Sequence, residues 1–176
     1  MKSLFLISLK AVALGVMVTA STAWADAPAE GDKAPEFSAK TLDGTGFNLA
    51  DYRGDKPVYL KFWATWCHYC KAEMPHLNNI RETHGDDIEV ITINVAMNDS
   101  VNNIRQFYQQ QGYALPTIFD QNGELPSRYG VVGTPHHVLI DRQGRIAYRT
   151  FLATDQLDQM ISDWSAQKAL NVGHAK

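Results

Sequence analysis

Only two cysteines occur in the 176-residue chain, Cys67 and Cys70, and two residues separate them. An apolar, aromatic segment (57–64) precedes the pair, and a helix-like segment (67–83) begins with it. A Cys-x-x-Cys pair between a strand and a helix is typical of a redox site. At a helix N-terminus, the unpaired N–H groups and the positive end of the helix dipole favour thiolate over thiol. The second cysteine lies on the same helix face, so the two sulfurs can close a small disulfide ring.

The first 25 residues have the pattern of a secretory signal peptide. Lys2 and Lys10 supply positive charge, residues 11–20 are apolar with many small side chains, and an Ala-x-Ala cleavage site ends at Ala25. An uncleaved anchor is the alternative, but the apolar segment is shorter than the roughly 20 residues that span a bilayer. We therefore expect cleavage after Ala25 and export from the cytosol.

The remaining chain has the length and charge of one mildly acidic domain. We expect a single domain over residues 26–170 and a disordered tail over 171–176. The full chain carries a net charge of −3, and the signal peptide removes two lysines and no acid, which argues against nucleic acid as a partner. Exported proteins often carry structural disulfides, but a ring this small stabilises a fold little. The cysteine pair is therefore better explained as redox chemistry, with no cofactor besides a Cys67–Cys70 disulfide.

The hydrophobic periodicity predicts alternating strands and helices after an early hairpin. The hairpin is expected within residues 37–49, around Asp43-Gly44. Strands are expected at 57–64, 88–95, 116–119, 137–140 and 146–151. Helices are expected at 67–83, from Asp99 or Ser100 to 111, at 125–129, and from Thr154 to about 167. This order predicts parallel strands with crossover helices, with 88–95 as a central strand, followed by an antiparallel hairpin and a closing helix.

This order of elements, with Gly133-Thr134-Pro135 before the last hairpin, resembles the thioredoxin fold. Finer features are similar to the TlpA/ResA branch of periplasmic thioredoxin-like proteins, and together they cover nearly all of the chain after residue 25. The matching segments are 31–37, 42–44, 62–67 (FWATWC), 73–75 (EMP) and 138–141. The resemblance implies an α/β thioredoxin fold, in which a central mixed β-sheet is flanked by helices, with a short N-terminal β-hairpin extension.

The resemblance also implies an activity and a setting. It implies a bacterial, periplasmic thiol:disulfide oxidoreductase, commonly a reductase that serves cytochrome c maturation or another client protein with cysteine thiols or a disulfide. Such a protein is usually recharged by a membrane-embedded electron donor. We expect a monomer, because no separate dimerisation module of the kind found in disulfide isomerases fits in the domain.

Three residues are assigned to the exchange chemistry. Cys67 is the expected nucleophile, and Cys70 is the expected resolving thiol and the more buried of the two. Glu73 is similar to an active-site acid of the family, which suggests that it moves a proton on or off Cys70. The alternative for Glu73 is a surface carboxylate that supports the first helix.

Three further residues are assigned to substrate binding. Pro135 matches the cis-proline of the family, and the Thr134 backbone beside it would pair with an extended client segment. Trp66 is expected to shield the disulfide. A turn with a trans proline is the alternative for Pro135.

The residues between and before the cysteines are expected to tune the redox potential. A protonated His68 would stabilise a Cys67 thiolate, whereas His68 and Tyr69 could equally form only a recognition surface. Lys61 lies where thioredoxins carry a buried acid. If it points inward, its ammonium favours a nearby thiolate; the preferred interpretation is a side chain that reaches solvent.

Other functions stay open from the sequence. The same fold could run exchange in the oxidising direction. A copper chaperone could use Cys67 and Cys70 with His136 or His137, since thiolates and imidazole suit Cu(I). Peroxidase activity is disfavoured, because peroxiredoxins carry Ser or Thr three residues before the reactive cysteine and Ala64 stands there.

Overall fold

The computed structural model describes residues 27–173, and its centre is a five-stranded mixed sheet with the strand order β5-β4-β3-β6-β7. Parallel pairing joins β3 to β4 and β4 to β5, while β6 is antiparallel to both β3 and β7. The strands are β3 (Val58–Trp63), β4 (Glu89–Asn94), β5 (Thr117–Phe119), β6 (His136–Ile140) and β7 (Ile146–Thr150). The predicted mixed sheet is confirmed, with β3 as its middle strand and β4 beside it.

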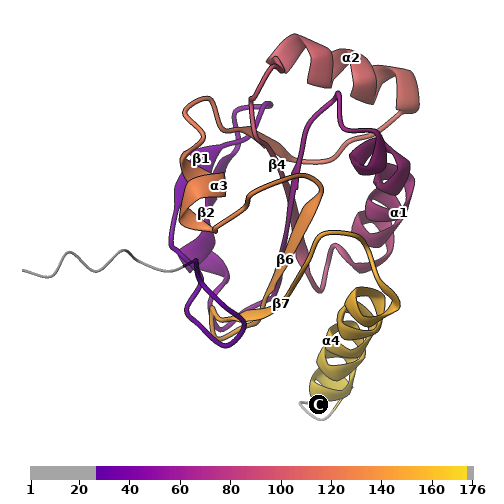
Figure 1. The fold of residues 1–176 in the computed structure, drawn as a ribbon. Helices are drawn as coiled ribbons and strands as arrows, with labels where there is room; N and C mark the ends of the chain where they lie inside the picture. Colours follow the sequence, from indigo (N-terminus) through magenta and orange to yellow (C-terminus); the bar gives the residue numbers. More distant parts are fainter. Residues whose placement is uncertain (1–26, 174–176) are drawn as a thin grey trace, which may run out of the picture.

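Helices cover both faces of this sheet (Figure 1). One hydrophobic cluster joins the sheet to α1 (His68–His84), α2 (Val101–Gln111) and α4 (Asp155–Gly173). The other cluster joins the opposite face to the short α3 (Glu124–Arg128) and to the N-terminal segment. This is the predicted α/β arrangement, with a buried face on each side of the strands.

The N-terminal hairpin forms as predicted and lies against the edge of the sheet. Its antiparallel strands are β1 (Ser38–Lys40) and β2 (Gly46–Asn48), and a 3₁₀ turn η1 (Leu49–Tyr52) follows. Gly44 lies in the hairpin turn with φ +90°, a conformation that favours glycine. The Leu42 amide donates to the carbonyl of Thr117 at 2.8 Å, which attaches the hairpin to β5.

The structure corrects the predicted end of the last helix and identifies the cap of α2. The last helix continues to Gly173 rather than ending at about residue 167, so residues 171–173 of the predicted disordered tail are helical. Ser100 is the N-cap of α2, because its hydroxyl accepts the Asn103 amide at 3.1 Å. The predicted signal peptide and residues 174–176 lie outside the described residues.

Alternation along β3 decides which side chains face α1. Tyr59 and Trp63 belong to the cluster beneath α1, whereas Leu60 and Phe62 belong to the cluster on the opposite face. Because side chains alternate along a strand, Lys61 lies on the α1 face with Tyr59 and Trp63. Within residues 27–173, no helix combines the length and apolar character needed to cross a membrane.

Candidate active site

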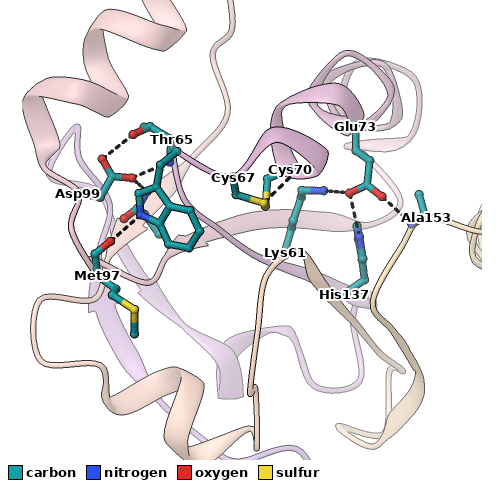
Figure 2. The surroundings of a disulfide bond; sticks show 11 residues. Lys61, Thr65, Cys67, Cys70, Glu73, Met97, Asp99, His137 and Ala153 are labelled. Carbon is teal, nitrogen blue, oxygen red and sulfur yellow. Dashed lines mark hydrogen bonds and ion pairs between the residues drawn. A yellow bond between two sulfur atoms is a disulfide. The ribbon is translucent and has the colours of Figure 1, made fainter.

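Cys67 and Cys70 form a disulfide at the start of α1, just after the middle strand of the sheet (Figure 2). Their sulfur atoms are 2.03 Å apart and their Cα atoms 5.2 Å apart. Cys67 is the N-cap residue, and its Sγ accepts the Cys70 amide at 3.1 Å. Cys70 is fully buried and Cys67 is 5 % exposed, so Cys70 is the more buried cysteine, as predicted.

Asp99, which the sequence offered only as a possible helix cap, holds the loop before Cys67. Asp99 accepts hydrogen bonds from the Thr65 amide at 2.6 Å and the Thr65 hydroxyl at 2.7 Å. The Asn94 side chain, at the end of β4, donates to the same carboxylate at 2.8 Å. Burial raises the pKa of Asp99, but these hydrogen bonds outweigh it and lower the pKa. The available signal was an acid placed just beyond the carboxyl end of a buried strand.

Glu73 lies in a polar cluster beside the disulfide, which we call the Glu73 cluster: Tyr59, Lys61, Glu73 and His137. Its Oε2 accepts from Lys61 Nζ and from His137 Nε2, the latter at 3.2 Å. Its Oε1 accepts the Ala153 amide at 2.8 Å. These donors come from β3, β6 and the loop before α4, so the carboxylate ties three segments to α1 (Figure 2).

Hydrogen bonds and charge decide the ionisation of Glu73. Burial alone would raise the pKa of its carboxyl. Hydrogen bonds from His137, Lys61 and the Ala153 amide, together with the Lys61 charge, lower that pKa from 4.5 to about 2. Burial lowers the pKa of Lys61, and the bond and charge of Glu73 oppose this effect. Glu73 is therefore ionised at neutral pH in the disulfide-bonded form, and its predicted part in moving a proton on or off Cys70 stays a prediction.

The prediction that Lys61 reaches solvent is wrong. The side chain is fully buried, and its ammonium pairs with Glu73. The physical reason is that β3 is the central strand and α1 covers its face, which leaves no path for the side chain to water. A buried ammonium requires a partner, and Glu73 supplies it from α1.

His136 and His137 point to opposite faces of the sheet and neither is bonded to a cysteine. His137 Nδ1 lies 2.6 Å from the Tyr59 hydroxyl, on the α1 face. His136 Nε2 lies 3.0 Å from Arg149, and burial together with the Arg149 charge lowers the pKa of His136 to about 4. Across residues 27–173, no three His, Cys, Asp or Glu side chains gather as a metal site. The structure thus does not bring the proposed copper ligands together.

Trp66 and Thr134 line an apolar groove of about 280 Å³ next to the cysteine pair. The Trp66 indole donates to the carbonyl of Met97 at 2.6 Å, and its side chain is 52 % exposed. The Thr134–Pro135 bond is cis, as the resemblance implied. The groove is lined by Trp66, Val95, Met97, Gly123, Pro126, Val131, Val132, Gly133 and Thr134.

The two residues between the cysteines are exposed at the same end of the molecule. Both His68 and Tyr69 lie at the surface, with their rings in edge-to-face contact at 5.9 Å between centroids. No hydrogen bond among the described residues ties either side chain to the sulfurs. Their predicted tuning of the redox potential stays a prediction.

A family model described as the AhpC/TSA family matches residues 30–149. This chain belongs to the AhpC/TSA family. Within the family it is a thiol:disulfide oxidoreductase of the ResA/DsbE type. Thiol-disulfide oxidoreductase ResA of Geobacillus thermodenitrificans is 35% identical over 121 residues, which are 68% of this chain and 68% of that protein.

Solved structures support the same fold for this AhpC/TSA member. A crystal structure provisionally described as thiol:disulfide interchange protein DsbE, from Chlorobium tepidum, has a TM-score of 0.69 and 30% identity, and covers 78% of this chain and 99% of that chain. The exposed lipoprotein thioredoxin Etrx1 of Streptococcus pneumoniae has a TM-score of 0.64 and 32% identity, and covers 73% of this chain and 99% of that chain. The thioredoxin fold and the oxidoreductase activity expected from the sequence are confirmed.

Proposed function

We propose that this protein reduces disulfides in client proteins, with Cys67 as nucleophile and Cys70 as resolving thiol. The observation that carries the proposal is the disulfide at the first turn of α1, next to the apolar groove that contains Thr134. In the reduced form, the N–H groups of that turn stabilise a Cys67 thiolate. The groove and the backbone of Thr134, before cis-Pro135, would hold an extended client segment.

The exchange proceeds in two balanced steps. First, the Cys67 thiolate attacks one sulfur of the client disulfide, which forms a mixed disulfide and releases the other client sulfur as a thiolate. Second, Cys70 attacks Cys67 Sγ, which closes the Cys67–Cys70 disulfide and releases the second client sulfur. The client gains two electrons and the protein loses two, so the two sulfurs carry the electrons without another cofactor.

The charge pattern around Cys70 favours the reducing direction. A lone buried ammonium would stabilise a nearby thiolate and make the disulfide a stronger oxidant. Lys61 is not alone, because the Glu73 carboxylate neutralises it. The alternative oxidising function would be favoured by a reduction potential near −120 mV, whereas a value near −270 mV favours the reductase.

The setting of the reaction completes the proposal. The predicted signal peptide would place the mature monomer in a bacterial periplasm, where a membrane-embedded dithiol donor would reduce the Cys67–Cys70 disulfide again. Precursors of c-type cytochromes, with two cysteines at the haem attachment site, are a suitable class of client. The apolar lining of the groove suits an extended segment with apolar side chains on both sides of the client disulfide.

Trapping of a mixed disulfide tests these roles. Pre-reduced protein is mixed with an oxidised model peptide that carries a Cys-x-x-Cys-His disulfide, and free peptide thiols are counted by alkylation. We expect Cys67→Ser to abolish peptide reduction and Cys70→Ser to accumulate a peptide adduct on Cys67. Full activity of Cys67→Ser, or no adduct on Cys70→Ser, refutes the proposed roles.

A further inference from the structure

The three groups hydrogen-bonded to the Glu73 carboxylate all present N–H groups to it. Lys61 Nζ and the Ala153 amide can only donate. The Tyr59 hydroxyl has one partner among the described residues, His137 Nδ1, at 2.6 Å. Because a buried hydroxyl needs an acceptor, the Tyr59 O–H donates to His137 Nδ1. The proton of the neutral imidazole then lies on Nε2, and this N–H donates to Glu73. A proton added at Oε2 would therefore face N–H groups and displace one of these bonds.

The carboxylate is also turned toward these donors. Glu73 and Cys70 lie three residues apart on α1, so both point to the sheet. Figure 2 shows the Glu73 carboxylate turned toward Lys61, His137 and Ala153, with dashed bonds to all three and none to a sulfur. Three groups from three other segments thus bracket the carboxylate, and two of their bonds converge on Oε2.

We propose that Lys61 and His137 are positioning residues that hold Glu73 as a fixed carboxylate, so that Glu73 acts on the cysteines as a constant charge and not as their proton carrier. This inference rests on the proposed exchange reaction. In the resolving step, Cys70 loses its proton, its sulfur forms the bond to Cys67 Sγ, and the departing client sulfur takes the electron pair of the broken bond. The client thiolate takes up the proton that Cys70 gives up, directly or through solvent, so the step balances without Glu73.

Two other charged groups, His76 and Asp158, lie near the Glu73 cluster. On α1, His76 contributes positive charge to the surroundings of His137 and is itself bonded to Asp158 of α4 at 2.7 Å. Burial raises the Tyr59 pKa well above its ordinary value, and the negative charges of Glu73 and Asp158 raise it further. The His76–Asp158 pair lies at the surface, so Lys61 is the buried cation in direct contact with Glu73.

Carbon-13 NMR of the labelled glutamate carboxyls tests the inference on the unmodified protein. The Glu73 signal is assigned by its loss in Glu73→Gln and followed from pH 4 to pH 9, in the oxidised and in the reduced protein. We expect no titration of Glu73 over this range in either form. A midpoint between pH 5 and pH 8 in either form overturns the inference. Because no client is present, this result is independent of whether the protein reduces clients.

A second measurement assigns the effect to the positioning residues. With the titration extended down to pH 2, we expect the Glu73 midpoint in Lys61→Met to lie more than one pH unit above that of the wild-type protein. The pH profile of mixed-disulfide resolution should then gain an inflection that Lys61→Met/Glu73→Gln lacks. Lys56→Met is the matched control. Lys56 forms an ion pair with Glu89, with 3.5 Å between Nζ and Oε2, and this pair lies away from the cysteines, so the substitution should leave the Glu73 midpoint unchanged. An unchanged midpoint in Lys61→Met refutes the role of Lys61. In His137→Gln, the Glu73 midpoint should also rise above the wild-type value. This variant keeps the test available if Lys61→Met does not fold.

Discussion

Replacement of Lys61 by methionine should destabilise the protein at neutral pH. Methionine matches the length of the lysine side chain and suits a buried site, so the loss is mainly that of the ammonium. Glu73 then keeps its bonds to His137 and the Ala153 amide, but its charge is left without a buried counter-charge. Removal of one partner of a buried ion pair is costly for this reason.

The pKa of Glu73 sets the scale of the effect. Its fall from 4.5 to about 2 corresponds to about 3 kcal/mol of stability at pH 7. Lys61 provides only part of this, and its removal also ends the cost of burying an ammonium. We therefore expect a loss of about 2 kcal/mol, with at least half of it recovered in Lys61→Met/Glu73→Gln. A depressed carboxyl pKa stabilises the fold above pH 4.5, and this contribution is lost as the pH falls toward 2, so the difference should shrink below about pH 4.

Urea unfolding of the oxidised proteins at pH 7 and pH 3, followed by circular dichroism, measures these differences. Lys56→Met is the control, because its partly exposed pair with Glu89 should contribute about 1 kcal/mol or less. The reasoning is refuted if Lys61→Met lies within about 0.5 kcal/mol of wild type at pH 7. It is also refuted if the difference at pH 3 equals or exceeds that at pH 7.

Substitutions at three other positions test the framework around the site. Asp99→Ala removes both bonds to Thr65, and we expect a loss of about 2 kcal/mol in urea unfolding together with faster proteolysis of the loop before Cys67; wild-type values for both would contradict the anchoring role. Tyr108→Phe leaves two buried threonine hydroxyls without this partner, and we expect a midpoint of thermal unfolding several degrees lower, corresponding to about 1 kcal/mol; a midpoint equal to that of wild type would count against these bonds. Ser100→Ala removes the cap of α2 and should cost about 1 kcal/mol, whereas Ser100→Asn should restore it; equal stability of the two variants would refute capping by this side chain.

Local patterns predicted much of the fold and the reacting pair. The spacing of Cys67 and Cys70 decided that both sulfurs lie on one helix face, because residues three apart in a helix are neighbours. The β-branched and aromatic segments predicted the strands, and Asp43-Gly44 predicted the hairpin. The cis bond before Pro135 could be expected only by resemblance, since the local sequence does not select that isomer.

The surroundings of the disulfide depended on contacts between distant segments. Lys61 and Glu73 are separated by 12 residues, and Glu73 and His137 by 64, so their meeting depends on the pairing of β3 with β6 and on how α1 lies across them. For the same reason, the sequence offered Asp99 only as a possible helix cap, although it is bonded to Thr65 across 34 residues.

The chain's own sequence therefore determined which atoms exchange electrons, since a Cys-x-x-Cys pair at a helix start is a local arrangement. Only the tertiary structure decided which charges surround them. A lysine on a strand can reach water or be buried, and the sequence does not distinguish these outcomes. In the folded protein, α1 covers Lys61 and places Glu73 against it, because burial of the ammonium is stable only with an opposite charge in contact.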